Sequence, residues 1–236
     1  MKFGRLGADH SMGYFGKIRN GIRQVVVSLR GSGLRATAAA VRRKLSEDRS
    51  YRRWLEKHGT LNETKRAELC DRAVSLPPRL ISVILPVYNI DEQWLRRAIG
   101  SVIAQIYTNW ELCVADDHST KPHVRRVLEE FAARDNRIKI VFREVNGHIS
   151  AASNTALEMA TGEFVVLLDH DDELSEDALF CIADELHKFP DTSMIYSDED
   201  LIDEHGRRYA PKFKPDWSRD LFYSVNIITH LSAYRT

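Results

Sequence analysis

Short apolar runs alternate with longer amphipathic segments through residues 79–236. The runs are rich in β-branched residues, which is typical of strands buried on both faces of a sheet. The intervening segments repeat apolar residues at helical intervals; in Glu92–Gln105, for example, Leu95, Ile99 and Val102 fall on one stripe. Strands that alternate with helices of this length indicate βαβ units. We therefore predict an α/β fold with a mostly parallel sheet flanked by helices.

The same pattern predicts where each element lies. Pro86 is expected to end the first strand, because proline donates no backbone N–H. Strands are expected at Leu80–Leu85, Trp110–Ala115, Ile138–Phe142, Phe164–Leu168 and from Met194–Tyr196 onward, and helices at Glu92–Gln105, His123–Arg134, Ser150–Ala160 and Glu176–Lys188.

A helical extension is predicted before this domain. Residues 34–59 form a basic amphipathic segment, and Thr60 with Glu63 forms a capping box that opens a further helix ending near Val74. Pro77 and Pro78 follow and mark a boundary, so the predicted domains are residues 1–78 and 79–236. Residues 1–20 mix glycines with basic and aromatic residues and are expected to be poorly ordered.

The formal net charge of zero conceals an asymmetry. Residues 1–80 carry 18 Lys and Arg against 7 Asp and Glu, whereas residues 81–236 carry 16 against 27. Two interpretations of the basic part stay open. It is either a helix that packs on the second domain with its charges solvated, or a peripheral contact of residues 1–57 with the anionic inner face of a plasma membrane. Nucleic acid is not expected as a partner.

The cysteines and the apolar runs indicate a cytoplasmic protein. The three cysteines are odd in number and widely spaced, which excludes a disulfide framework or a zinc pattern. No run approaches the ~20 apolar residues of a membrane-spanning helix. The first ten residues lack the apolar core of a signal peptide.

Polar side chains follow several of the predicted strands. Tyr88, Asp117, Asp169 and Asp171 all stand just beyond an apolar run. Carboxyl ends of parallel strands share one edge of a sheet, so we expect these side chains to converge there. Clustered carboxylates suit a hard divalent cation such as Mg²⁺ or Mn²⁺ that carries phosphates. The alternative without a ligand is that the acidic cluster forms a solvated turn, with Asp172 as a helix cap.

The chain contains neither G-x-G-x-x-G nor G-x-x-x-x-G-K-[ST]. A nucleotide bound at this edge would therefore be held by a metal and side chains rather than by a glycine-rich loop.

Five segments in order, ISVILPVYN, ELCVADDHS, NGHISAASNTALEMATGEFVVLLDHDD, YSDEDLID and KFKPDWSRDLF, resemble the family-2 glycosyltransferases with the GT-A fold. The resemblance covers residues 80–236 and is greatest to the branch that assembles bacterial O-antigen, rhamnan and other surface polysaccharides. It implies a nucleoside diphosphate sugar donor, a saccharide or lipid-linked saccharide acceptor, and a divalent metal, Mn²⁺ or Mg²⁺.

The resemblance also implies roles for individual residues. Asp117 would accept a hydrogen bond from the base, Asp169 would lie near the ribose hydroxyls and Asp171 would bind the metal. Ser153 stands where relatives often have Arg. The remaining nucleotide-sugar-binding residues would be Pro86, Tyr88 and Asn89 at the base, and Asn146, Gly147 and Asn154 along the ribose and diphosphate.

The implied reaction is transfer with inversion, in which the metal neutralises the leaving diphosphate and an acidic residue acts as general base. Relatives supply that base from a motif beyond the KPDW segment, and none follows here before Thr236. Asp198 and Asp200 are weak candidates for it. We therefore expect a C-terminally incomplete domain, and the alternative function is a non-catalytic nucleotide-sugar-binding protein.

Overall fold

The computed structural model describes residues 2–4 and 49–236. The chain divides into two compact units. One contains Asn62–Thr236 together with the strand at residues 2–4. The other contains Leu6–Leu61, of which only residues 49–61 are described. The predicted domain division at residue 78 stays a prediction.

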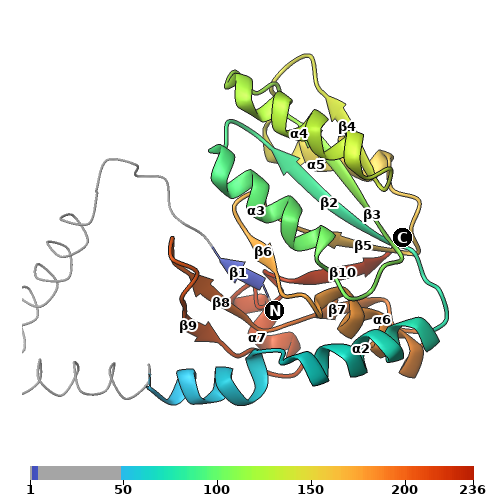
Figure 1. Ribbon diagram of the computed structural model, residues 1–236, viewed down its shortest axis with the longest axis vertical. Coiled ribbons are helices and arrows are strands. Elements are labelled where there is room, and N and C mark those ends of the chain that lie inside the picture. The colour runs from blue at the N-terminus through green and yellow to red at the C-terminus, as the bar shows by residue number, and fades with distance from the viewer. Residues whose placement is uncertain (1, 5–48) are drawn as a thin grey trace, which may run out of the picture. The chain divides into compact units, whose positions relative to one another are not determined.

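The larger unit is built on a six-stranded mixed sheet (Figure 1). Its central strand β2 (Ile81–Val87) pairs in parallel with β3 (Trp110–Asp116) and with β5 (Phe164–Leu167). The parallel strand β4 (Ile138–Phe142) forms one edge beside β3. On the other side, β10 (Ser232–Arg235) runs antiparallel to β5 and to the edge strand β7 (Met194–Tyr196). The mostly parallel α/β sheet expected from the sequence is confirmed.

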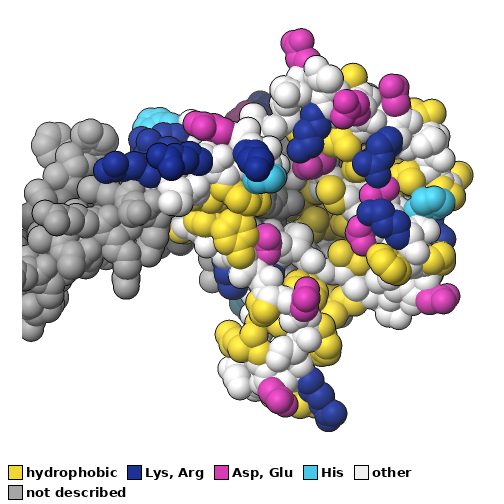
Figure 2. All heavy atoms as spheres, turned by 90° about the horizontal axis from the view of Figure 1, so that it is seen from below, with side chains coloured by type: hydrophobic (Ala, Val, Ile, Leu, Met, Phe, Trp, Pro, Cys, Tyr) yellow, Lys and Arg dark blue, Asp and Glu magenta, His cyan; other side chains and the backbone are white. Residues whose placement is uncertain are grey.

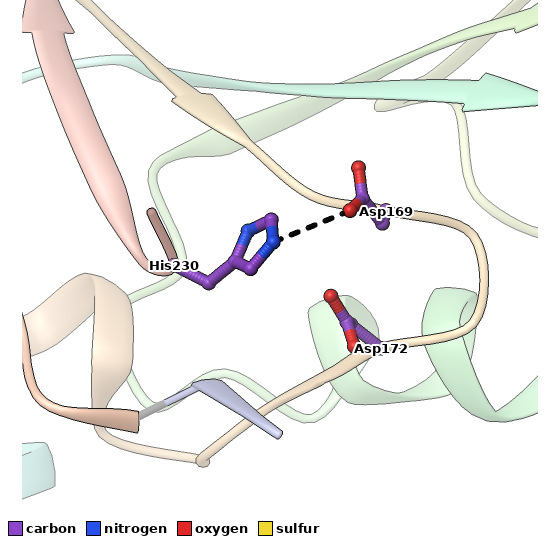
Figure 3. Close-up of side chains that lie close together, drawn as sticks. All are labelled: Asp169, Asp172 and His230. Carbon is purple, nitrogen blue, oxygen red and sulfur yellow. Dashed lines mark ion pairs between the residues drawn. The ribbon is translucent and has the colours of Figure 1, made fainter. Parts of the chain in front are cut away.

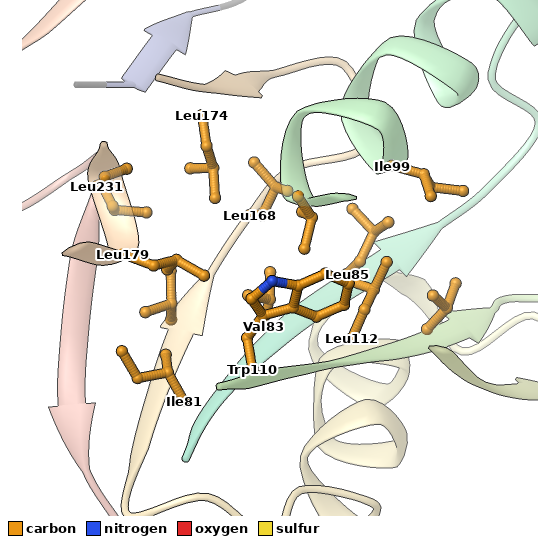
Figure 4. Packing of buried hydrophobic residues seen from close by; sticks show 14 of the residues in the cluster. Ile81, Val83, Leu85, Ile99, Trp110, Leu112, Leu168, Leu174, Leu179 and Leu231 are labelled. Carbon is orange, nitrogen blue, oxygen red and sulfur yellow. The ribbon is translucent and has the colours of Figure 1, made fainter. Parts of the chain in front are cut away.

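Helices cover both faces of the sheet. On one face, apolar side chains of β2 such as Val83 and Leu85 pack with helices α3, α4 and α6 around the buried indole of Trp110 (Figure 4). On the other, Ile84 and Cys113 pack on α5. Every residue of β2 and β3 is buried, as their unbroken apolar runs predicted. The helices are α2 (Glu63–Ser75), α3 (Glu92–Ile103), α4 (Pro122–Arg134), α5 (His148–Glu158) and α6 (Ala178–Lys188).

A second, four-stranded sheet follows from segments that the sequence pattern missed. Its strands lie in the order β6, β1, β8, β9, and only β1 with β8 is parallel. A short helix, α7 (Arg219–Ser224), precedes β10. The four strands are β6 (Glu173–Leu174), β1 (Lys2–Gly4), β8 (Glu199–Ile202) and β9 (Arg208–Lys212).

Three local predictions need correction. Asn62, not Thr60, caps α2, because its side chain accepts the Lys65 N–H at 2.8 Å. Pro86 lies inside β2 rather than ending it; pairing with β5 stops at Ile84, so the missing N–H of Pro86 interrupts no ladder. Residues 2–4 form a strand, against the expectation of disorder there.

Most of the predicted basic helix lies outside the described residues. Residues 49–54 are helical and continue into the π-helix η1 (Leu55–Gly59), with the rings of Tyr51 and Trp54 stacked at 5.9 Å. Among the helices in the described ranges, none combines the length and apolar character needed to cross a membrane. On the face of the molecule shown in Figure 2, Lys and Arg side chains lie beside acidic and hydrophobic ones.

A buried carboxylate ties the turn before β5 to the sheet. Glu111 accepts hydrogen bonds from Ser82 Oγ at 2.6 Å, Lys139 Nζ at 2.5 Å and the Thr161 N–H at 2.5 Å. Burial raises the pKa of Glu111, but these hydrogen bonds outweigh burial and hold that pKa at about 2. The next residue, Gly162, donates its N–H to Ser82 Oγ.

Gly162→Ala tests how closely this turn packs on β2. An added Cβ would lie 2.6 Å from the Leu80 carbonyl oxygen and 2.9 Å from the Ser82 nitrogen, both backbone atoms. We expect a loss of about 1–3 kcal/mol in the free energy of unfolding, measured in urea. The control Gly100→Ala, a helical site with nothing within 4 Å, should gain about 0.5–1 kcal/mol. Equal effects at both sites would contradict the packing described.

Candidate functional site

A cavity of about 310 Å³ opens beyond the carboxyl ends of β2 and β3. Four residues predicted from the sequence to bind a nucleotide meet there. Of the four side chains expected to converge at this edge, Tyr88 and Asp117 line the cavity, whereas Asp169 and Asp171 do not. The lining consists of Pro86, Val87, Tyr88, Asp117, Asn146, His148, Ile149, Ala152 and His170.

Asp117 is fixed at the cavity by a buried ion pair. The residue is only 2% exposed, and its Oδ1 accepts hydrogen bonds from Arg143 Nη1 at 2.8 Å and from the Gly147 N–H at 3.0 Å. Its backbone N–H bonds to the Val87 carbonyl, and its own carbonyl accepts from the Asn146 side chain. A buried carboxylate needs such a counter-charge. Arg143 was not singled out from the sequence, because its partner lies 26 residues earlier.

The rest of the cavity wall is largely apolar. Tyr88 is 44% exposed and Ile149 is 63% exposed, although both line the cavity. Apolar and aromatic walls with a few polar groups, among them the fixed carboxylate of Asp117, suit a flat, partly polar ligand such as a nucleobase.

Three other predicted residues lie differently. Gly147 is the N-cap of α5 and contributes its N–H to Asp117. Asn89 is not among the cavity-lining residues, and its side-chain oxygen accepts the N–H groups of Thr120 and Lys121. Asn154 is exposed on α5 and is also absent from the lining. Their ligand roles stay predictions.

A second polar group follows β5. Asp169, Asp172 and His230 each place a ligand atom within 4.8 Å of the others, and His230 Nε2 lies 3.4 Å from Asp169 Oδ2 (Figure 3). Asp172 is buried, while Asp169 and His230 are partly exposed. Two ligands of one Mn²⁺ or Mg²⁺ ion lie up to about 4 Å apart, so this spacing fits one ion after small side-chain movements.

The donor set of two carboxylates and one imidazole fits Mn²⁺, which accepts both ligand types. Asp169 had been expected beside the ribose, and Asp171, expected to bind the metal, is not in this group. The role of Asp171 stays a prediction. His230 was not identified from the sequence; it precedes β10, a strand that the apolar pattern did not reveal.

The cavity and the acid–histidine group share one short loop. His170 lines the cavity, and its Nδ1 lies 3.2 Å from the Pro86 carbonyl oxygen. Asp169, the residue before it, and Asp172, two residues after it, belong to the acid–histidine group. One ligand with a flat ring and an attached phosphate could therefore use both.

The weak candidates for a general base make structural contacts. Asp200 is buried, and its Oδ2 accepts from Arg208 Nε at 2.6 Å. Asp198 Oδ1 accepts the Lys214 N–H at 2.7 Å, and Asp198 lines a separate cavity of about 360 Å³ with Trp217. Their catalytic role stays a prediction.

The chain belongs to glycosyl transferase family 2, whose model matches residues 82–235. This confirms the resemblance seen in the sequence motifs.

Among its relatives, an uncharacterized protein of Sinorhizobium fredii is 54% identical over 155 residues, and the O-antigen biosynthesis protein RfbC of Myxococcus xanthus is 38% identical over 175. Those matches cover 66% and 73% of this chain, but only 17% and 14% of the relatives. The chain thus spans a small part of the length of either protein.

Solved structures confirm the GT-A type of fold. The crystal structure of S. aureus TarS residues 1–349 matches with a TM-score of 0.51 and 26% identity, covering 66% of this chain and 46% of that one. The same protein in complex with UDP-GlcNAc matches with a TM-score of 0.53 and 25% identity, covering 66% of this chain and 45% of that one.

Arg143→Met tests whether the ion pair holds the cavity together. Removing the cation leaves Asp117 buried without its counter-charge, so we expect a loss of about 3 kcal/mol in the free energy of unfolding at pH 7. Arg134→Met is the control, because Arg134 is 69% exposed where it pairs with Glu130, and this pair should contribute less than about 1 kcal/mol. Similar losses in both variants would show that the Arg143–Asp117 pair contributes no more to the free energy of unfolding than an exposed pair does.

Proposed function

We propose that this chain binds a nucleoside diphosphate sugar, with the base in the cavity and the diphosphate beside Asp169, Asp172 and His230. The observation that carries the proposal is the loop of residues 169–172, which contributes to both places. A nucleotide sugar joins the two chemistries that these places suit, a flat ring and a phosphate held through a cation.

Asp117 selects the kind of base. A carboxylate offers only acceptor atoms, so it favours bases with a ring N–H on their pairing edge, which uracil, thymine and guanine have and adenine and cytosine lack. Arg143 and Gly147 occupy mainly Oδ1, which leaves acceptor capacity on Oδ2. The ring of Tyr88 lies on the cavity wall and would contact the base through its face. The TarS complex with UDP-GlcNAc supports a donor of this class.

The acid–histidine group would hold Mn²⁺ or Mg²⁺ through Asp169, Asp172 and His230, with Asp171 as a further candidate. The bound ion would neutralise the charge that develops on the leaving diphosphate. The protein's own contribution is to hold two carboxylates and an imidazole together at the end of β5, close to the cavity.

The acceptor is proposed to be a saccharide or lipid-linked saccharide of a growing surface polysaccharide, and the transfer to invert the anomeric centre. The O-antigen biosynthesis protein among the relatives supports this class of product. An acidic general base must remove the proton of the attacking hydroxyl. Cytoplasmic location and a membrane contact through residues 1–57 belong to the same proposal.

The binding test measures thermal stability with UDP, dTDP or GDP, each with and without Mn²⁺. A ligand at 100 times its dissociation constant adds about 2.7 kcal/mol, which is easily detected. We expect one nucleotide to stabilise the protein, and Mn²⁺ to increase the effect. His230→Ala should remove the Mn²⁺-dependent part, whereas His205→Ala, which alters an exposed turn, should not. Asp171→Ala in parallel separates its role from that of Asp172.

Thermal stabilisation by a nucleotide that is the same with and without Mn²⁺, and the same in His230→Ala, would contradict the proposed metal site. Release of nucleoside diphosphate from a nucleotide sugar would separate the enzyme from the alternative, a non-catalytic binding protein, which would bind the donor without releasing product.

A further inference from the structure

The segment just before β10 is fixed by a buried lysine. The side chain of Lys214 is only 2% exposed, and its Nζ donates hydrogen bonds to the His230 carbonyl at 2.5 Å and to the Ile228 carbonyl at 3.4 Å. Removing an ammonium group from water is unfavourable unless fixed acceptors replace the water. These two carbonyls provide that replacement, and they belong to the segment that carries His230.

The carboxylate of Glu199 binds the same segment through the backbone N–H of His230. Glu199 Oε2 accepts the His230 N–H at 3.3 Å, and both oxygens of Glu199 accept the Thr229 hydroxyl at 3.2 Å. Glu199 Oε2 lies 3.9 Å from Lys214 Nζ. The N–H and the C=O of His230 are thus both bound to charged side chains, and such hydrogen bonds are stronger than neutral ones.

The side chains of Glu199 and Lys214 come from a hydrogen-bonded part of the second sheet and the residues next to it. Glu199 begins β8, and it pairs across the sheet with Lys212, the last residue of β9. Lys214 follows two residues later, and its backbone N–H bonds to Asp198. The positions of Glu199 and Lys214 are therefore fixed by the hydrogen bonds of the β8–β9 hairpin.

We propose that Lys214 and Glu199 are positioning residues that hold His230 in place as a metal ligand. The proposal rests on the metal site of the proposed function and extends it to the second sheet. An imidazole has few rotamers, so fixing the His230 backbone restricts where Nε2 can lie. In the structure Nε2 lies 3.4 Å from Asp169, on the side of the group opposite the loop that supplies the carboxylates (Figure 3).

The test compares Lys214→Met with Lys212→Met in the full 236-residue chain. Both changes remove one lysine that faces Glu199, but Lys212 is 51% exposed, and its Nζ bonds to the Thr229 hydroxyl at 3.4 Å rather than to the backbone of His230. Mn²⁺ binding is measured by the loss of the free-ion electron paramagnetic resonance signal. Residues that orient a ligand typically change metal affinity 10- to 100-fold, so we expect a rise of about that size in the dissociation constant for Lys214→Met and none for Lys212→Met.

Two further variants keep the test decisive if Lys214→Met folds poorly. Glu199→Gln keeps the shape but weakens the hold on the His230 N–H, and should also weaken Mn²⁺ binding. Lys214→Arg keeps the charge and should recover part of the affinity. The visible spectrum of bound Co²⁺ should change in Lys214→Met, because a displaced imidazole alters the ligand field, which a loss of stability alone would not do.

The outcomes separate the two proposals. If the unaltered chain binds no Mn²⁺, with or without nucleotide, the proposed metal site fails. If the unaltered chain binds Mn²⁺ and Lys214→Met, Glu199→Gln and Lys212→Met all bind it equally well, the positioning role is overturned while the metal site stands.

Discussion

The structure depends on the parallel pairing of β2 with β3 on one side and with β5 on the other. All three strands are almost wholly buried between helices, so their carboxyl ends are the places where the polypeptide can leave the core and become polar. Val87, Asp116 and Leu167 end these strands on one edge of the sheet. Side chains at and just beyond these ends are brought together although they are distant in sequence, as Pro86 and His170 are at 84 positions apart.

Two kinds of charge arrangement follow from that constraint. Asp117 lies at the wall of the cavity and is buried, so it needs a fixed cation, which Arg143 provides. Asp169 and His230 remain partly exposed and lie close to the buried Asp172, and this set of oxygen and nitrogen donors suits a divalent cation. In the proposed function, the first arrangement would accept a hydrogen bond from the base, and the second would bind phosphates through a metal.

The second sheet connects to this edge through the backbone. Glu199 and Lys214 leave the β8–β9 hairpin and bind the N–H and C=O of His230, just before β10 enters the main sheet. The YSDEDLID and KPDW segments thus contribute backbone support to the site, in addition to any contact with ligands. A change in the hairpin would be transmitted to the imidazole through these two hydrogen bonds.

The sequence predicted the elements whose pattern is local. Apolar runs located β2 to β5 and β7 within two residues, and helical stripes located α3 to α6. Strand β10 was not predicted, because SAYR has no apolar run and becomes a strand only through its distant partners β5 and β7. His230, which precedes this strand, was not predicted either. The place of Asp117 at the sheet edge could be predicted because it directly follows a strand, whereas its cation Arg143 follows a different strand, and no spacing rule links the two.

The most direct measurement is a crystal structure with bound UDP and Mn²⁺, using anomalous scattering at the manganese edge. The account predicts one strong manganese peak about 2.1 Å from a carboxylate oxygen of Asp169 or Asp172 and from His230 Nε2, with the base in the cavity beside Asp117. A manganese peak elsewhere, or a nucleotide bound away from Asp117, would contradict it.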